Sequence, residues 1–236
     1  MKYKAILFDL DGTLLPMDMD EFCYGYFGDL FEKLEPYGMS KETMMKAMGT
    51  GIRAMAANEG CNTNDQAFWN NFEFITGFKR ADIEDVCDEF YEKDFHRSKR
   101  FTKDNPYAAK AVKLAHEKAQ KVVLATNPYF PYAGQKTRIS WVGLHEQDFD
   151  LITHYTSEHF CKPNPKYYMA ICKKIGVEPK DCLMIGNDER EDMYAASMIG
   201  IHCYLVTDCV IKDAEHPWQG EQGNFDDMME MLQQLD

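Results

Sequence analysis

The stretch KAILFDLDGT, residues 4–13, decides the fold of this 236-residue chain. Its first half, Lys4 to Phe8, is a short apolar run closed by Asp9, which is the pattern of a strand buried on both faces of a parallel sheet. Open α/β sheets bind their ligands at the carboxyl ends of such strands. We therefore expect Asp9 and Asp11 to lie at the ligand edge of a sheet.

The two aspartates place two negative charges in one small volume. Residues i and i+2 of an extended chain end point the same way, so the carboxylates of Asp9 and Asp11 repel each other unless a cation or a shared proton compensates. Gly12 permits a tight turn after them, and the Thr13 hydroxyl can tie the loop. The structural alternative is an ordinary Asx-turn at a strand end, because Asp and Gly are common turn residues.

Four further apolar runs repeat the pattern of the first. They are Lys121 to Ala125, Phe149 to Thr153, Cys182 to Ile185 and Cys203 to Val206. Helical stretches separate them, among them Pro106 to Gln120 and a helix that Asn164-Pro165 opens and Gly176 stops. Because these stretches are long enough for crossover connections, the alternation predicts an α/β fold with a right-handed, doubly wound parallel sheet.

The alternation fails between residues 16 and 100, where apolar residues such as Phe22 and Tyr26 recur at helix spacing and Ser40 can cap a helix. We expect about four helices inserted after the first strand. The predicted domains are residues 1–15 plus 101–236, an α/β core, and residues 16–100, a helical domain. With 17 acidic and 10 basic residues, the insert is itself acidic.

Composition and charge narrow the possible functions. The chain has 26 Lys and Arg against 39 Asp and Glu, and its formal charge of −13 argues against nucleic acid or an anionic membrane as the main partner. No stretch is apolar for as long as a membrane span requires. Asp9 and Asp11 interrupt the first apolar run where a signal peptide would stay apolar, and the eight cysteines form no CxxC pair. We therefore expect a cytoplasmic protein with reduced thiols.

Polar residues follow the other predicted strands as well. Thr126-Asn127 follows the second run, Lys162 comes after the third, and Gly186-Asn187-Asp188, with Asp192 beyond, follows the fourth. Each group has a structural alternative, as a turn opener, a solvated loop lysine or, for Asp188 with Glu191, a helix capping box. Their joint appearance at the carboxyl ends of candidate strands favours a common site.

With these motifs the chain resembles the haloacid dehalogenase (HAD) superfamily of hydrolases. The matching motifs are FDLDGT (8–13), LATN (124–127), CKPNP (161–165) and IGNDEREDM (185–193). The resemblance covers about the whole chain. It implies a Rossmann-like sheet with strand order 5-4-1-2-3 and a mobile helical cap, of the type called C1, inserted between the first two motifs.

The resemblance also implies a chemistry. The chain would be a Mg²⁺-dependent phosphatase that hydrolyses a small phosphorylated metabolite through an aspartyl-phosphate intermediate. Asp9 would be the nucleophile, and Asp11 would protonate the leaving alkoxide and then deprotonate water. Thr126, Asn127 and Lys162 would bind the phosphoryl group, although Asn127 could instead position a neighbouring carboxylate. Mg²⁺ would be bound by the Asp9 carboxylate, the Asp11 carbonyl and the acidic cluster.

The fourth motif offers two candidates for the last metal ligand. Most family members place Asp directly after the Gly of this motif, where this chain has Asn187. Register from Gly186 favours Asn187, whereas the spacing counted back from Asp192 favours Asp188. A hard dication prefers a charged oxygen, so we favour Asp188 as the ligand, with Asn187 lining the site. The structural alternative makes Asp188 only the N-cap of the next helix.

Other activities remain as alternatives. Dehalogenases of this family lack the second acid, because a halide needs no proton, so Asp11 favours an alkoxide leaving group. A sugar-phosphate mutase shares the motifs and is the enzymatic alternative, and a catalytically silent binding module is the alternative from another class. Arg53 is a candidate partner for a substrate carboxylate or second phosphate, or else a solvated helix arginine. The sequence identifies neither the individual substrate nor the oligomeric state.

Overall fold

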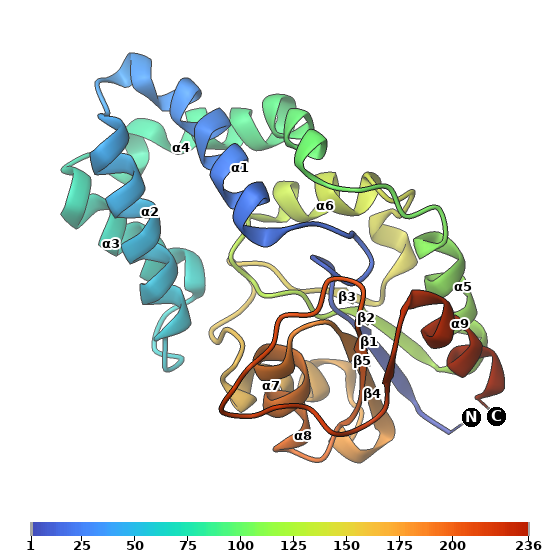
Figure 1. The fold of residues 1–236 in the computed structure, drawn as a ribbon. Coiled ribbons are helices and arrows are strands. Elements are labelled where there is room, and N and C mark those ends of the chain that lie inside the picture. The colour runs from blue at the N-terminus through green and yellow to red at the C-terminus, as the bar shows by residue number, and fades with distance from the viewer. Residues whose placement is uncertain (1, 236) are drawn as a thin grey trace.

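The computed structural model describes residues 2–235 and contains a six-stranded parallel sheet (Figure 1). The strands are β1 (Ala5–Phe8), β2 (Lys121–Leu124), β3 (Leu151–Ile152), β4 (Cys182–Gly186), β5 (His202–Val206) and β6 (Gln222–Gly223). They lie in the order β3-β2-β1-β4-β5-β6, and each neighbouring pair is parallel. The predicted order 5-4-1-2-3 is confirmed. The edge strand β6 was not predicted, because its two residues form no apolar run.

The central strand β1 is buried on both faces, as its composition predicts. All four of its residues are fully buried, and successive side chains point to opposite faces. Ile6 and Phe8 pack with the helices of one face, which are α5 (Ala108–Lys118), α6 (Tyr132–Ser140) and α9 (Phe225–Gln234). Ala5 and Leu7 pack with those of the other face, α7 (Pro165–Ile175) and α8 (Ala195–Ser197). The doubly wound α/β architecture is therefore confirmed.

Helix α7 begins and ends where the sequence predicts. The Asn164 side chain accepts a hydrogen bond from the Lys166 backbone N–H at 3.0 Å, Pro165 is the first helical residue, and Gly176 ends the helix with a φ of 68°. A left-handed residue at this position satisfies the last carbonyls of a helix, and glycine adopts it without a steric penalty. The fixed start of α7 positions Lys162, three residues before it.

Four α-helices follow β1 in the chain and lie together on one side of the sheet domain (Figure 1). They are α1 (Met19–Leu34), α2 (Lys41–Ala56), α3 (Asn64–Thr76) and α4 (Arg80–Glu89), followed by a π-helical turn at Phe90–Asp94 and a 3₁₀ segment at Phe95–Phe101. Ser40 caps α2 as predicted, because its side chain accepts a hydrogen bond from the Thr43 backbone N–H. We call residues 16–100 the helical insert.

The helical insert contacts the sheet domain in two places. On α1, the ring of Phe22 lies 6.3 Å from that of Trp141 and 6.5 Å from that of Phe130, measured between centroids. At the start of α3, the Asn64 backbone N–H donates to the Glu158 carbonyl at 2.8 Å. The contact made by α1 is apolar, and the contact made by α3 is polar. The insert therefore connects to the sheet domain at both of these places.

The two segments that connect the insert to the sheet domain pair with each other. Met17 and Thr102 form an antiparallel bridge, and the Lys103 backbone N–H donates to the Pro16 carbonyl at 2.8 Å. The chain therefore leaves the sheet domain and returns to it at one point.

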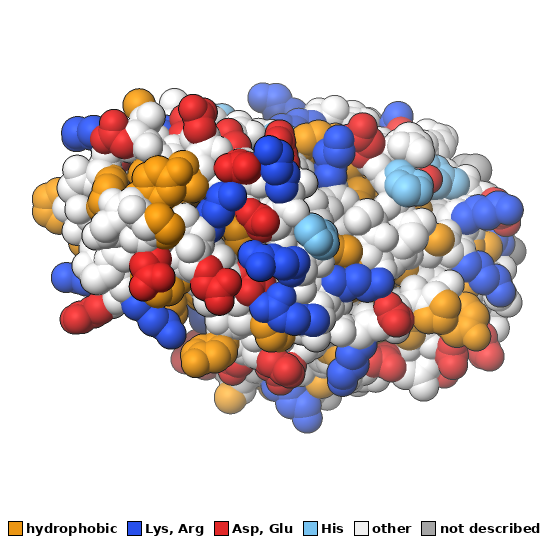
Figure 2. Space-filling view, turned by 90° about the horizontal axis from the view of Figure 1, so that it is seen from above, with side chains coloured by type: hydrophobic (Ala, Val, Ile, Leu, Met, Phe, Trp, Pro, Cys, Tyr) orange, Lys and Arg blue, Asp and Glu red, His pale blue; other side chains and the backbone are white. Residues whose placement is uncertain are grey.

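The described surface carries charges of both signs (Figure 2). On the face in Figure 2, acidic and basic side chains are interspersed, and hydrophobic side chains gather mainly toward the two ends. None of the described helices is both long and apolar enough to cross a membrane. All eight cysteines are free thiols.

Candidate active site

The parallel register brings the predicted site residues to one edge of the sheet. Phe8 of β1 lies beside Leu124 of β2 and Ile185 of β4, so the residues that follow these strands emerge together. The Asp9 backbone N–H continues the ladder by donating to the Ile185 carbonyl at 2.9 Å.

The turn after Asp9 requires a glycine. Gly12 has a φ of 87°, and a Cβ atom at this position would lie 2.2 Å from Nδ2 of Asn187. Both the left-handed backbone and the close approach exclude a larger residue. The Thr13 hydroxyl donates to Oδ1 of Asn187 at 3.0 Å. The hydroxyl thus ties the first motif to the fourth, and the simple Asx-turn alternative does not account for this contact.

Lys162 is not a solvated loop lysine. Its side chain is 1% exposed, and its Nζ lies 2.8 Å from Oδ1 of Asp9 and 2.6 Å from Oδ1 of Asp192. Burial by itself lowers the pKa of Lys162, but the carboxylates of Asp192 and Asp9 outweigh it and hold the pKa well above its ordinary value. The lysine therefore stays charged and links the first motif to the fourth.

Asp9 is buried beside other carboxylates. Burial is the main cause that raises the pKa of Asp9 to about 7; Lys162 opposes the rise, and Asp192 and Asp11 add to it. The site therefore carries more negative charge than Lys162 alone compensates.

Asp11 makes an ion pair that sequence reasoning missed. Its Oδ2 accepts a hydrogen bond from Nη1 of Arg138 on α6, while its Oδ1 is buried without a hydrogen-bond partner. The arginine side chain is fully buried. One carboxylate oxygen of Asp11 is therefore held in place, and the other remains unpartnered.

Arg138 is itself fixed by its surroundings. Its guanidinium stacks on the Phe130 ring at 4.0 Å from the centroid and donates to Oε1 of Gln135. The Gln135 amide in turn donates to the Thr153 carbonyl at 3.0 Å. Nothing in the single sequence distinguishes Arg138 from a solvent-facing helix arginine, because burial of a charge depends on partners from distant elements.

Thr126 and Asn127 lie beside these residues. The carbonyl of Thr126 accepts hydrogen bonds from the hydroxyls of Thr153 and Tyr167, and the Thr126 hydroxyl makes none within residues 2–235. The Asn127 side chain donates to Oε2 of Glu191 at 2.8 Å, and its Oδ1 is buried without a partner. Of the two roles expected for Asn127, the contact with a neighbouring carboxylate is the one this geometry contains.

Asp192 organises the loop of the fourth motif. Its Oδ2 accepts from the backbone N–H groups of Asn187 at 3.0 Å and Asp188 at 3.1 Å, while its Oδ1 contacts Lys162. A Cβ atom on Gly186 would lie 2.2 Å from Oδ2 of Asp192, so the carboxylate approaches the backbone only because this residue is glycine. Asp192 therefore fixes the direction in which the two candidate metal ligands leave β4.

Asn187 and Asp188 differ in how their side chains are used. The Asn187 amide donates to the Cys209 carbonyl at 2.7 Å and accepts from Thr13, so both of its ends are occupied. Asp188 is an N-cap, because its Oδ1 accepts from the backbone N–H groups of Arg190 and Glu191 at 2.8 Å each. Its other oxygen makes no hydrogen bond within the described chain, so capping leaves it able to bind a cation.

Glu191 is a second residue that sequence reasoning treated only as a capping partner. Burial raises its pKa to about 8, and the neighbouring Asp188 adds to the rise. Burial and the charge of Asp192 raise the pKa of Asp188 in the same direction. The fourth motif is therefore a partly buried acidic cluster in which burial and neighbouring charges oppose ionisation.

The donor set fits a hard divalent cation. Five carboxylates contact or border two buried cationic side chains, those of Lys162 and Arg138. The five are Asp9, Asp11, Asp188, Glu191 and Asp192. A dication would compensate the excess charge, and one carboxylate oxygen of Asp188 makes no hydrogen bond within the described chain. Among the described residues, three acidic or imidazole side chains converge within 4.8 Å only at Asp213, Glu215 and His216, which lie outside this site. A Mg²⁺ ion here would thus be bound by fewer side-chain carboxylates, together with backbone oxygen and water.

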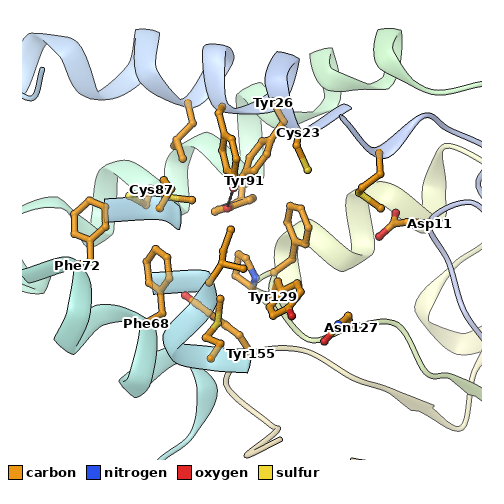
Figure 3. A pocket seen from close by; sticks show the side chains of 18 of the residues that line it. Asp11, Cys23, Tyr26, Phe68, Phe72, Cys87, Tyr91, Asn127, Tyr129 and Tyr155 are labelled. Carbon is orange, nitrogen blue, oxygen red and sulfur yellow. Dashed lines mark hydrogen bonds between the residues drawn. The ribbon is translucent and has the colours of Figure 1, made fainter. Parts of the chain in front are cut away.

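A cavity of about 290 Å³ borders the site on the side of the helical insert. Figure 3 shows Asp11 and Asn127 at one end of the cavity. Side chains of the helical insert, including those of α1 and α3, surround the rest of it. Asp188 and Glu191 also line it. The cavity therefore joins the acidic edge of the sheet to the interior of the insert.

Comparison with known proteins identifies the family. A family model for haloacid dehalogenase-like hydrolases matches residues 3–200. Among curated relatives, "Putative phosphatase YhcW" of Bacillus subtilis (strain 168) is 24% identical over 205 residues, which cover 86% of this chain and 83% of YhcW.

Two solved structures have the same fold over nearly their whole length. A 2-haloacid dehalogenase from Pseudomonas syringae pv. Tomato DC3000 has a TM-score of 0.66 at 15% identity, covering 99% of this chain and 100% of that one. The putative HAD-hydrolase YfnB from Bacillus subtilis, bound to magnesium, has a TM-score of 0.59 at 17% identity with the same coverage. The family match, supported by this fold and these motifs, shows that the chain is a hydrolase of the haloacid dehalogenase superfamily.

Proposed function

We propose that this enzyme is a Mg²⁺-dependent phosphatase that hydrolyses a small phosphomonoester through an aspartyl-phosphate intermediate on Asp9. The observation that carries the proposal is the buried contact of 2.8 Å between Lys162 and Asp9, with the carboxyl group of Asp11 two residues away and one of its oxygens unpartnered. A nucleophile beside a buried cation and a second carboxyl group are what transfer of a phosphoryl group from an alcohol requires.

In the first step, a carboxylate oxygen of Asp9 forms a bond to phosphorus while the bond from phosphorus to the alcohol oxygen breaks. Arg138 holds Oδ2 of Asp11, so Oδ1 carries the proton that the departing alkoxide receives. In the second step, Oδ1 of Asp11 accepts a proton from water as the water attacks phosphorus. The bond between phosphorus and Asp9 then breaks, and inorganic phosphate leaves.

Other residues hold the phosphoryl group and the charge. The Thr126 hydroxyl and the Lys162 ammonium donate hydrogen bonds to the phosphoryl oxygens, and Lys162 also orients Asp9. Asn127 positions Glu191. Asp9, the Asp11 carbonyl and Asp188 would hold Mg²⁺, which would supply charge stabilisation for the phosphoryl group. The magnesium in the YfnB structure supports this choice of cation.

The domain division is part of the proposal. Residues 1–15 and 101–236 form the catalytic core, and residues 16–100 form a cap that covers the site. The paired segments at Met17 and Thr102 support a single hinge region, and the cavity between insert and core supports a covering role. The YfnB structure is described as revealing interdomain movement, which agrees with a hinge.

The test is turnover of para-nitrophenyl phosphate with Mg²⁺ and with EDTA. Asp9→Asn should lower turnover by several orders of magnitude, because the amide is not a nucleophile, while thermal unfolding shows that the fold is kept. A variant that keeps a tenth of the wild-type rate would exclude Asp9 as the nucleophile. A silent binding module would show no turnover in the wild type. A mutase would return the phosphoryl group to a sugar phosphate in place of releasing phosphate.

A further inference from the structure

The cavity extends from the catalytic end into the helical insert. In Figure 3, Asp11 and Asn127 lie at one end, Phe68 and Phe72 lie at the other, and Tyr26 and Tyr91 lie between them. A group attached to a phosphoryl oxygen near Asp11 would therefore lie between the insert helices.

Away from the catalytic end the wall of the cavity is apolar. Side chains from α1, α2 and α3 that line it include Phe27, Leu30, Met48, Ile52, Met55 and Phe72. The hydroxyls of Tyr26 and Tyr91 hydrogen-bond to each other. Burial raises the pKa of both tyrosines, so they stay neutral. The wall therefore presents hydrocarbon, sulfur and neutral aromatic surface.

The charged residues of the wall are all acidic. Asp11, Asp188 and Glu191 stand at the catalytic end, and Asp88 is on α4. Among the described residues that line the cavity, none is Lys, Arg or His. Arg53, the candidate partner for a second anionic group, is exposed and does not line the cavity, so the structure favours the solvated arginine. A second anion on the substrate would be buried here without a partner, which is strongly unfavourable.

We propose that this cavity binds the leaving group of the substrate, and that the substrate is a phosphomonoester of an uncharged, apolar alcohol. The inference rests on the proposed phosphatase function and adds the substrate class to it. A cavity of about 290 Å³ holds on the order of ten non-hydrogen atoms, at about 30 Å³ for each water-sized group. The alcohol is therefore medium-sized, with an alkyl or arylalkyl body.

An aromatic wall with acidic neighbours could also suit a quaternary ammonium group. Two features favour the apolar alcohol. Aliphatic and sulfur-containing side chains, such as Leu30, Ile52 and Met55, form a large part of the wall, and of the described lining residues contributed by the insert helices only Asp88 is charged. Phosphocholine is therefore included in the test as the competing substrate.

The experiment measures kcat/KM with Mg²⁺ for n-alkyl phosphates from butyl to decyl and for 2-phenylethyl phosphate. We expect a rise of about fourfold per methylene up to hexyl or octyl phosphate, followed by a plateau, because each buried methylene contributes a constant increment. A high value for 2-phenylethyl phosphate would support an arylalkyl body in the same way. The value of kcat/KM should be at least tenfold lower for phosphoglycolate, pyrophosphate and phosphocholine than for butyl phosphate.

The outcomes separate this inference from the proposed function. A flat alkyl series, or a preference for phosphoglycolate or phosphocholine, would overturn the substrate class while leaving the phosphatase in place. Failure to turn over any ester, para-nitrophenyl phosphate included, would instead overturn the proposed function.

Variants of α2 test the location. Ile52→Phe fills part of the cavity and should bring the plateau to shorter chains, lowering kcat/KM for octyl phosphate by more than for butyl phosphate. Ile52→Lys adds a positive charge to the cavity. It should raise the ratio of kcat/KM for phosphoglycolate to kcat/KM for octyl phosphate by at least tenfold. Arg53→Ala, one residue away on the exposed side of α2, is the matched control and should change neither property. Equal chain-length profiles for Ile52→Phe and Arg53→Ala would overturn the assignment of the cavity.

Discussion

Arg138 and Asp11 form a buried ion pair between α6 and the catalytic loop. The guanidinium is fully buried, stacks on Phe130 and holds one oxygen of the carboxyl group whose other oxygen is proposed to move the proton. Because Arg138 holds Oδ2 of Asp11, the position of Oδ1 is fixed as well. In the proposed mechanism, Arg138 is therefore a positioning residue for Asp11, the acid and base.

Replacing Arg138 should separate chemistry from folding. Arg138→Met leaves Asp11 without its partner and should lower kcat by about ten- to a hundredfold, as misplacing a catalytic group does, with little change in KM. The loss should be larger for alkyl phosphates, whose leaving oxygen needs a proton, than for para-nitrophenyl phosphate. Arg138→Lys should recover part of the rate. If both ester classes lose rate equally while the melting temperature falls, the role of Arg138 is structural.

Asp188 and Asn187 give a second prediction at this scale. Asn caps a helix about as well as Asp, so Asp188→Asn should keep the melting temperature while it raises the Mg²⁺ activation constant severalfold. Asn187→Ala removes the links to Thr13 and Cys209 and should lower the melting temperature, with a smaller effect on Mg²⁺ activation. The measurements are phosphatase rate against Mg²⁺ concentration and thermal unfolding. An unchanged constant in Asp188→Asn, with a raised one in Asn187→Ala, would make the asparagine the ligand.

Most of the site residues that sequence reasoning identified directly follow strand ends. Asp9, Thr126 and Asn187 could be placed together because parallel strands end at a common edge. Arg138 could not, because it lies within a helix and its partner is 127 positions away in the chain. Glu191 was recognised only as part of a capping box, although its side chain contacts Asn127. Local patterns report local hydrogen bonds, and these two contacts are between distant elements.

At the scale of elements, the π-helical turn Glu189–Tyr194 turns the fourth motif toward the site. Asp192 lies in this turn and makes contact with both the preceding loop and Lys162. Its side chain is 1% exposed. The turn therefore connects the end of β4 to the buried lysine.

Asp192→Asn tests this connection. The amide keeps the size of the side chain but removes one charge beside Lys162, and breaking a buried pair costs about 3–5 kcal/mol. We expect a clearly lower melting temperature and a reduced rate, both measured in the presence of Mg²⁺. Asp213→Asn, in the acidic group outside the site, is the control, because it makes the same chemical change where the carboxylate is partly exposed and pairs with His216. Equal stability of the two variants would show that Asp192 does not hold the turn.

Helix α7 and the strands β1, β2, β4 and β5 were predicted to within a residue or two, whereas β3 and β6 were not. α7 has a cap, a first-turn proline and a terminal glycine, and its bounds follow from them. The strand β3 has only two residues, although five were expected from Phe149 to Thr153, because pairing with β2 and not apolar character sets its length. β6 pairs through the backbone of Gln222 and Gly223 and has no side-chain pattern at all.

For the whole molecule, the sequence predicted a helical insert but not its relation to the core. A single cluster of buried apolar residues runs from β1 through Phe22 and Tyr26 into the insert. In the sequence, the apolar residues that recur at helix spacing, such as Tyr26, indicated only where helices lie. Many of them also line the cavity that leads to Asp11, because one face of a helix can both pack against its neighbours and line a cavity when the helices do not close fully. That outcome depends on how α1, α2 and α3 meet, which no single helix encodes.

The charge of the site should influence the stability of the whole molecule between about pH 4 and pH 8. The pKa of Asp9 is raised to about 7 and that of Glu191 to about 8, whereas in the unfolded chain both carboxyls titrate near 4. Between these values the folded protein binds more protons than the unfolded chain. The free energy of unfolding therefore falls as pH rises, by up to about 1.4 kcal/mol per pH unit for each proton. His154, whose pKa burial lowers, acts in the opposite direction below about pH 6.5, so the window from pH 6.5 to 8 is the clearer one.

We therefore expect the melting temperature of the metal-free protein, measured in EDTA, to fall between pH 6.5 and 8. Glu191→Gln removes one of the two late-titrating protons and should flatten this slope. Because Mg²⁺ binds ionised carboxylates and competes with their protons, it should raise the melting temperature more at pH 8 than at pH 6.5. Glu215→Gln, in the exposed acidic group, should leave both trends unchanged. A melting temperature that rises with pH in EDTA would mean that the acidic cluster is ionised and compensated without a metal, and the proposed site would then have no excess charge for Mg²⁺ to relieve.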